Sequence, residues 1–301
     1  MANAKEIKRK IWSIKNTQKI TKAMELISTV KMKKAQDLAL SKREFVLEMS
    51  KIFLRVENFL DEFPLFNKWK WNKTLAVIVT SNKWLCWGYN INVMKKVSEY
   101  IKKTDEKLEF VTIWKKAANF VAKTWNKLIA DFSPEFSDYI EGVFTKDISG
   151  MLRKEFLSWK YSKVVIFYNH YLNTIKQIPV AKISLPIDSE QIKDYLSDVV
   201  EDFEWLKDEL EKEVSSYTFE PYEQELAEQV IPMILDMIFN DILLESKASE
   251  HSARMVAMKW AKDNAWKIAS NLTLMYNKAR QAVITWEVSE ITAWVESMKE
   301  V

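Results

Sequence analysis

The chain has 301 residues, 48% of them hydrophobic, so it is long enough to bury a sizeable core in one or two domains. It holds no run of eighteen apolar residues and starts with a polar, basic stretch, which predicts neither a membrane span nor a secretory signal. The single cysteine, Cys86, excludes an internal disulfide framework and favours a reducing compartment, so we expect a cytoplasmic protein without direct membrane insertion.

Charge is unevenly distributed, although the net charge is only +3. Residues 1–43 hold twelve Lys or Arg against three acidic residues, a net of +9. Residues 188–225 hold fourteen acidic residues against three Lys, a net of −11. The basic N-terminal part is therefore expected to be attracted to acidic surfaces.

Residues 1–60 are predicted to form one long helix. Ile7, Ile11 and Ile14 are four and three residues apart, which is the 3.5-residue repeat of a coiled-coil seam. Ile20 and Ile27, with Met24 between them, repeat the pattern after a break in phase, which predicts a stutter in the coiled coil.

Residues 70–220 are predicted to form an α/β domain. Short β-branched strands are expected at 74–80, 108–113, 164–168 and 178–183, with helices near 90–103, 115–124 and 145–158. Strands that alternate with helices indicate a partly parallel sheet, and Pro179 places its own strand at an edge. Residues 188–220 are predicted to be an acidic, exposed segment that is at most partly helical.

The third predicted region, residues 221–301, is a second long helix that begins between Pro221 and Pro232. Its expected seam contains the apolar residues Ile268, Leu272, Met275, Ala279, Ala282, Val288, Ile291, Val295 and Met298. Helices of this length need a partner, and the economical one is the other end of the same chain. The predicted fold is α/β plus a long antiparallel coiled coil: N- and C-terminal helices pair as a rod, and a small Rossmann-like α/β domain is inserted between them.

No catalytic, cofactor or metal site is predicted. The turn after the first strand lacks the spacing of a phosphate-binding loop. His170 and His251 have no neighbours suited to a metal site, and Cys86 fits a small buried hydrophobe better than a nucleophile. Three classes stay open on these residues: a mechanical rod, a coiled-coil adaptor or nucleic-acid-binding protein, and a nucleotide-dependent enzyme.

Tryptophan and glycine are present in abnormal numbers. The chain has 13 tryptophans but 3 glycines, where average usage gives about 21 glycines in this length. Trp84 and Trp87 lie in the turn after the first strand, where glycine is the favoured residue. We therefore hypothesise that the reading frame uses UGA for glycine, and that these positions are glycine in the native protein.

Dense motifs at both ends carry a resemblance to a known family. Residues 14–24, IKNTQKITKAM, and residues 31–35, KMKKA, closely resemble the N-terminal signature of the gamma subunit of rotary F-type ATP synthase. Residues 249–258, SEHSARMVAM, and residues 274–285, LMYNKARQAVIT, are similar to its C-terminal signature. Residues 80–90 resemble the family's segment after its first strand, and the family pattern has glycine where this chain has Trp84, Trp87 and Trp294.

The resemblance implies a non-catalytic rotor shaft that couples ion flow through the c-ring to ATP synthesis or hydrolysis. It implies alpha, beta and epsilon subunits and the c-ring as partners, no nucleic acid, no cofactor, and a peripheral place on the cytoplasmic side of the cell membrane. Arg280, Gln281 and Thr285 match residues that bind catalytic-subunit loops. A second group, which matches the contact with an acidic part of the beta subunit, contains Met24, Glu250 and Arg254, with five lysines suited to the same surface: Lys19, Lys22, Lys31, Lys33 and Lys34.

Overall fold

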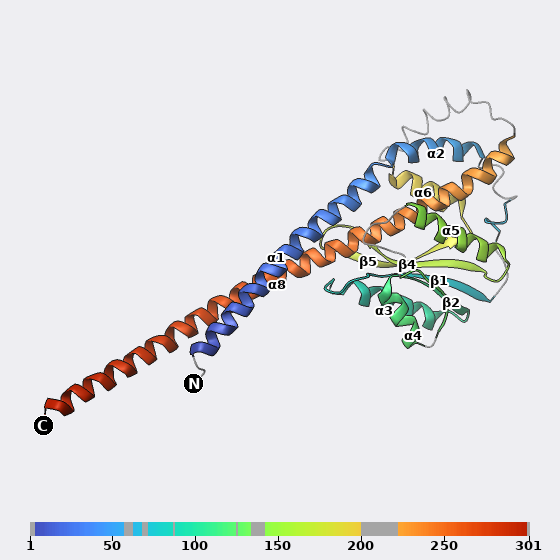
Figure 1. The fold of residues 1–301 in the computed structure, drawn as a ribbon. Coiled ribbons are helices and arrows are strands. Elements are labelled where there is room, and N and C mark those ends of the chain that lie inside the picture. Colours follow the sequence, from blue (N-terminus) through green and yellow to red (C-terminus); the bar gives the residue numbers. More distant parts are fainter. Residues whose placement is uncertain are drawn as a thin grey trace. The chain divides into compact units, whose positions relative to one another are not determined.

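The computed structural model describes residues 4–56, 63–67, 72–86, 88–124, 126–133, 142–199 and 222–299. The chain divides into two compact units, and Figure 1 labels the helices and strands. The rod unit consists of residues 1–29 and 254–301, and the head unit consists of residues 30–253. Helices α1, Ala4–Leu40, and α8, Glu223–Lys299, each supply residues to both units.

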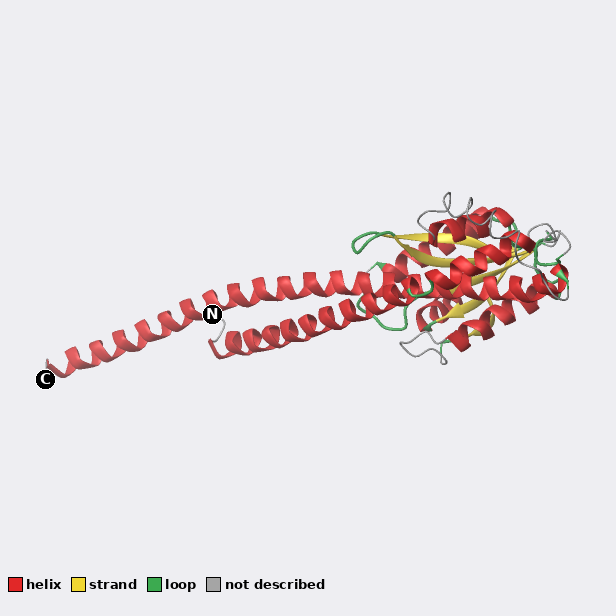
Figure 2. Ribbon diagram, turned by 90° about the horizontal axis from the view of Figure 1, so that it is seen from above, coloured by secondary structure: helices red, strands yellow, loops and turns green. Residues whose placement is uncertain are grey.

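In the rod unit, α1 and α8 lie side by side and run in opposite directions (Figure 2). An ion pair joins them, because the Lys262 ammonium lies 2.8 Å from the Glu25 carboxylate. The predicted pairing of the two ends of the chain as a rod is confirmed.

The seam on α1 follows the 3.5-residue repeat without a break, so the predicted stutter is wrong. Ile20 and Ile27 are 61% and 55% exposed. Seven of the less exposed positions advance alternately by four and three residues: Ile7, Ile11, Ile14, Gln18, Thr21, Glu25 and Ser28. Asn16 and Met24 are partly buried beside this line. A phase change would rotate the contact line away from α8, and polar side chains such as Thr21 and Ser28 occupy the line instead.

Before residue 280, the seam on α8 differs from the prediction at two positions, where the residue that follows the predicted one lies in the seam. Leu272 and Ala279 are partly buried as expected, but Ile268 and Met275 are 49% and 55% exposed. The seam passes instead through Met258, Ala265, Ala269 and Tyr276. Alanine at a seam allows two helices to approach closely, a possibility that apolar spacing alone does not reveal.

The single helix predicted for residues 1–60 is wrong, because it breaks at Ser41 and Lys42. A second helix, α2, covers Arg43–Val56. Its buried residues Val46, Met49 and Phe53 join the core of the head unit. Lys42 fixes the break by donating to Asn240 at 2.5 Å and to Asp241 at 3.0 Å. Tertiary burial of the α2 face therefore overrides the continuous helical pattern.

The head unit contains a five-stranded sheet in the order β3-β2-β1-β4-β5. The strands are β1, Lys73–Val79, β2, Lys107–Ile113, β3, Lys127–Asp131, β4, Lys163–Tyr171, and β5, Gln177–Leu185. The first four are parallel, and β5 pairs with β4 in antiparallel fashion at the edge that Pro179 predicts. The sequence analysis missed β3, which is five residues long and pairs on one side only.

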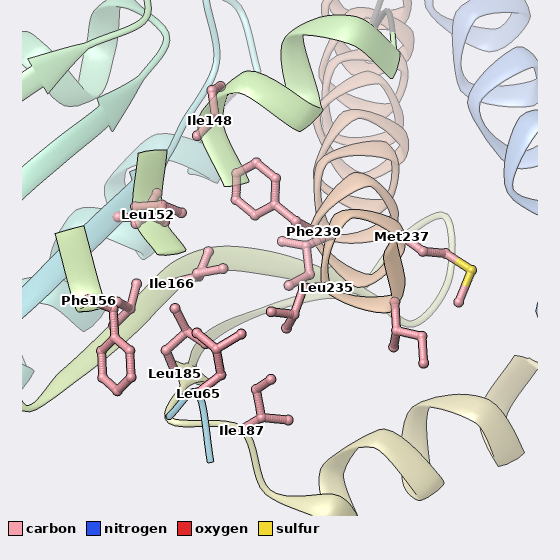
Figure 3. Packing of buried hydrophobic residues seen from close by; sticks show 14 of the residues in the cluster. Leu65, Ile148, Leu152, Phe156, Ile166, Leu185, Ile187, Leu235, Met237 and Phe239 are labelled. Atoms are coloured by element: carbon pink, nitrogen blue, oxygen red, sulfur yellow. The ribbon is translucent and has the colours of Figure 1, made fainter. Parts of the chain in front are cut away.

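Helices cover both faces of this sheet (Figure 1). One face packs against α3, Tyr89–Lys103, and α4, Lys115–Lys123. The other packs against α2, α5, Gly142–Leu157, and the head-unit part of α8. Figure 3 shows this second core, where Leu235 and Phe239 of α8 lie near Ile166 of β4 and Leu152 of α5. The three predicted helices of this region are therefore confirmed.

The acidic segment is described only in its first part. Residues Ser189–Val199 form helix α6, where Ile192 is buried in the core. The rest of the predicted segment, residues 200–220, lies outside the described residues. No helix of the described part combines the length and the apolar character needed to cross a membrane.

Glu109 on β2 is a buried carboxylate that ties strands together. It accepts hydrogen bonds from the Tyr161 hydroxyl at 2.6 Å and from the Lys127 ammonium at 3.0 Å. Burial raises the pKa of this carboxyl, but these hydrogen bonds and the charges of Lys127 and Lys73 outweigh burial, so its pKa lies below the ordinary value of 4.5. Its charged form therefore stabilises the fold above pH 4.5, and that contribution is lost as the pH falls through the lowered pKa.

We expect Glu109→Gln to lower the free energy of unfolding by about 1–2 kcal/mol at neutral pH, because a charged acceptor becomes a neutral one. The difference from the unmodified chain should shrink as the pH falls below 4.5 and should be lost below the lowered pKa, where the carboxyl of the folded chain is also neutral. Urea denaturation followed by circular dichroism at several pH values measures both effects. Glu155→Gln, which removes a pair with exposed Lys160, is the matched control and should change stability by less than about 0.5 kcal/mol. An equal effect of the two variants would contradict this role for Glu109.

Candidate partner-contact surface

The C-terminal part of α8 is exposed along its whole length. Residues 280–298 are all exposed, whereas Ala279 and the seam positions before it are at least partly buried. Figure 2 shows the reason within the rod unit, since α8 continues past the N-terminal end of α1. We call residues 280–298 the terminal segment. The predicted seam residues Val288, Ile291, Val295 and Met298 lie here, so the rod unit does not bury them as the sequence analysis expected.

The terminal segment carries many apolar side chains for an exposed helix. The large ones are between 48% and 76% exposed: Val283, Ile284, Trp286, Val288, Ile291, Trp294, Val295 and Met298. Four of them, at 288, 291, 295 and 298, are spaced by three, four and three residues and so lie on one face. A helix of this length has marginal stability alone in water, and a continuous apolar stripe on it marks an interaction surface.

Three predicted contact residues lie in the terminal segment. Arg280, Gln281 and Thr285 are all exposed and face solvent in the isolated chain. The Thr285 hydroxyl donates to the Gln281 carbonyl at 2.9 Å, a bond within one turn of the helix. Gln281 and Thr285 are four residues apart and share a face, whereas Arg280 is offset by one position. Their guanidinium, amide and hydroxyl groups are suited to hydrogen bonding with loops of a partner.

The second predicted group is spread over both units. Met24 and Arg254 belong to the rod unit and Glu250 to the head unit. Arg254 is 6% exposed and Met24 is partly buried. Met24 is next to Glu25, which forms an ion pair with Lys262 of α8. Arg254 lies eight positions before Lys262 on α8, about 12 Å along the helix axis. Glu250 is 2% exposed and forms an ion pair with Lys247 at 2.9 Å.

Basic side chains mark the outer face of α1. Lys19 and Lys22 of the rod unit are exposed, as are Lys33 and Lys34 of the head unit, while Lys31 is partly buried. The seam contact that sequence reasoning missed is the pair of Glu25 and Lys262. Its signal was available, because opposite charges beside the two seams of an antiparallel coiled coil attract across the interface.

The place where doubly wound sheets bind ligands is occupied here by α8. Such sites lie at the carboxyl ends of the strands where the strand order reverses, which is between β1 and β4 in this sheet. There Tyr89 donates to the Ser246 carbonyl at 2.9 Å, and Ser249 donates to the Asn169 carbonyl at 3.1 Å. The Asn169 amide in turn donates to the Tyr89 carbonyl at 2.9 Å. The crevice that a nucleotide would use is thus filled by the protein's own helix, which counts against the nucleotide-dependent enzyme.

Glu245 and the buried Cys86 of the head unit hold its elements together. Burial raises the pKa of the Glu245 carboxyl, which pairs with His170 and accepts from the Tyr171 N–H at 2.9 Å, joining α8 to β4. Cys86 is 2% exposed, with its sulfur 3.4 Å from the Ser81 hydroxyl. Among the described residues, no group of three or more His, Cys, Asp or Glu side chains is arranged to hold a metal ion.

Comparisons with known proteins agree with this arrangement. A family model described as ATP synthase matches residues 3–298. The chain is 32% identical to the ATP synthase gamma chain of Roseiflexus castenholzii over 317 residues, covering 100% of both chains. It is also 32% identical to the ATP synthase gamma chain of Akkermansia muciniphila over 301 residues, covering 99% of this chain and 100% of that one.

Solved structures share the fold. A chain of the Euglena gracilis mitochondrial ATP synthase, in a structure of OSCP, F1 and c-ring, aligns with a TM-score of 0.62 at 16% identity, covering 98% of this chain and 94% of that one. A chain from the central stalk and c-ring of the Tetrahymena thermophila mitochondrial enzyme aligns with a TM-score of 0.55 at 21% identity, covering 80% and 99%.

The terminal segment should tolerate polar substitution in the isolated chain. We expect the Ile291→Ser, Val295→Ser double variant to change the free energy of unfolding by less than about 0.5 kcal/mol, because both side chains are already exposed. Ile7→Ser, which is the matched change in the seam, should cost about 2 kcal/mol or more since Ile7 is 5% exposed. Thermal unfolding of the helical signal measures both. A large loss in the double variant would mean that the segment packs within the chain.

Proposed function

This chain belongs to the ATP synthase gamma chain family, and from that premise we propose that its terminal segment is the surface held by the catalytic subunits. The chain is the central rotor subunit of an F-type ATP synthase. It has no catalytic site of its own, and it couples ion flow through the c-ring to ATP synthesis or hydrolysis. Its partners are the alpha, beta and epsilon subunits and the c-ring.

The proposal rests on one observation: the C-terminal part of α8 continues past the N-terminal end of α1. Residues 280–298 expose an apolar stripe that no described residue of the rod unit covers. Each large apolar side chain of this stripe gains about 1.5 kcal/mol or more when it is buried. A ring of subunits around the end of α8 would cover this stripe together with the other exposed faces of residues 280–298.

The mechanical logic follows from symmetry. A single rod inside a ring of three alpha and three beta subunits contacts each catalytic subunit differently. Rotation of the rod then favours the open or the closed state of each subunit in turn. The shift in each equilibrium is limited by the difference in contact energy that the rod supplies to the two states.

Individual contact residues extend this proposal. Arg280, Gln281 and Thr285 would bind loops of the catalytic subunits near the end of the shaft. Met24, Glu250 and Arg254 would lie at the contact with the acidic part of the beta subunit. The exposed lysines of α1 support that role, because an acidic surface would attract them.

The three regions expected from the sequence divide the task. The sequence predicted residues 1–60 and 221–301 as the shaft and residues 70–220 as the α/β domain. In this proposal the rod unit is the shaft, and the head unit, which also includes α2 and the first part of α8, contacts the epsilon subunit and the c-ring. The chain is part of the membrane-associated ATP synthase complex, and we place it on the cytoplasmic side as a peripheral subunit.

The Arg280→Ala, Gln281→Ala double variant tests the contact residues. In an ATP synthase reconstituted with this chain, we expect coupled ATP turnover to fall about tenfold, because a lost hydrogen bond to a charged group costs about 1.5–3 kcal/mol. The isolated variant should unfold like the unmodified chain, since both side chains are exposed. Turnover and thermal unfolding are measured on the same preparations.

The matched control is Asn277→Ala with Lys278→Ala, two exposed positions of the same helix just before the segment. It should alter turnover less than twofold if contacts begin with Arg280. Equal losses in both double variants, or unchanged turnover and assembly in the first, would contradict the assigned contacts. The same assay tests the apolar stripe, because the Ile291→Ser, Val295→Ser variant should fold normally but assemble poorly.

A further inference from the structure

Three residues other than glycine adopt a positive φ in the described part of the chain. They are Leu85 at 70°, Trp114 at 69° and Trp159 at 61°. Two of the three are tryptophan, which makes up only 13 of the 301 residues. A bulky residue is the least suited to this region of backbone space, because its β-carbon meets the neighbouring carbonyl oxygen.

The backbone at Trp114 is a conformation that belongs to glycine. Its φ of 69° is combined with a ψ of 150°, in a region that is essentially restricted to glycine. The residue links the end of β2 to the first turn of α4, and its carbonyl accepts from the Ala117 N–H at 3.1 Å. The turn between a parallel strand and its helix therefore requires this conformation.

The backbone at Trp159 requires glycine for a different reason. It follows the end of α5, and its N–H donates to the Phe156 carbonyl at 3.2 Å, while the Ser158 N–H donates to Lys154 at 3.0 Å. This is the position just after a helix C-terminus, where the chain turns through the left-handed region and glycine is strongly enriched.

Most tryptophans in the described part are exposed, although the Lys116 ammonium lies 3.1 Å from the centre of the Trp84 ring. Of the eight tryptophans in the described part, Trp114 alone is buried. The other seven are between 54% and 76% exposed: Trp12, Trp84, Trp159, Trp260, Trp266, Trp286 and Trp294. Tryptophan is a residue that proteins mostly bury, since its large apolar surface is the reason for using it.

We propose that positions 114 and 159 carry glycine in the protein that the native cell makes, and that the same decoding of UGA applies to all thirteen tryptophan positions. The 3 glycines and 13 tryptophans would then become sixteen glycines, close to the roughly 21 that average usage gives. The inference rests on backbone geometry and burial and is independent of what the protein does. Leu85, the third residue with positive φ, is the neighbour of Trp84 in the same loop.

Peptide mapping of the protein purified from its native host decides the proposal. Trypsin releases residues 108–115, which contain position 114, and residues 155–160, which contain position 159. We expect glycine at both positions and an intact mass that matches replacement of all thirteen indoles. Tryptophan at either position, or an intact mass that requires indoles elsewhere, would overturn it.

The conformational basis can be tested separately in recombinant protein. Glycine should be more stable than alanine at both positions, so Trp114→Gly and Trp159→Gly should melt about 3 °C or more above Trp114→Ala and Trp159→Ala. The comparison with alanine cancels most of the cavity that is left at buried position 114. Trp12, inside α1 and 70% exposed, is the matched control, because alanine should be the more stable replacement within a helix. Alanine equal to or better than glycine at 114 and 159 would contradict the assignment.

Discussion

Burial of the seam between α1 and α8 is the interaction on which the rod unit depends. Neither helix has an apolar core of its own, and each is stable because the other covers one narrow face. The seam is formed by small and polar side chains as well as isoleucines, with the buried Ala265 and Ala269 on α8 and the buried Thr21 and Ser28 on α1. Beyond the N-terminal end of α1, α8 is no longer covered by a second helix. There the terminal segment exposes the apolar stripe that a rotor needs for contact with its ring.

The head unit uses α8 in a second way. Its N-terminal part contributes Leu235 and Phe239 to the core on one side of the sheet. A few turns later, Ser246 and Ser249 hydrogen-bond across the carboxyl ends of β1 and β4. A sheet of this topology would be open to a ligand at that point, and the helix closes it. Helix α8 thus fills the crevice in which sheets of this topology bind nucleotides. This agrees with a subunit that transmits force and has no catalytic site of its own.

The backbone conformation at the tryptophan positions bears on the proposed decoding of UGA as glycine. Propensity and burial normally agree within a natural protein, and a residue type that repeatedly opposes both needs a common cause. Trp114 and Trp159 have backbone conformations that suit glycine, while exposed tryptophans such as Trp12 lack the burial for which proteins use an indole. Glycine at these places removes both conflicts at once, and it also restores ordinary turn chemistry after β2 and after α5.

The sequence alone determined the existence and type of most elements, because strong periodicity fixes the type of an element even where tertiary packing decides its ends. It identified the two terminal helices, four of the five strands and the edge position of the Pro179 strand, and its end motifs identified the family. It missed β3, whose five residues are fixed by pairing with β2 and carry little pattern of their own. Only the tertiary structure decided the break at Lys42, the seam through Thr21 and Ser28, and the point where α1 stops protecting α8. Each of these depends on which face of a helix finds a partner, and spacing along one chain does not contain that information.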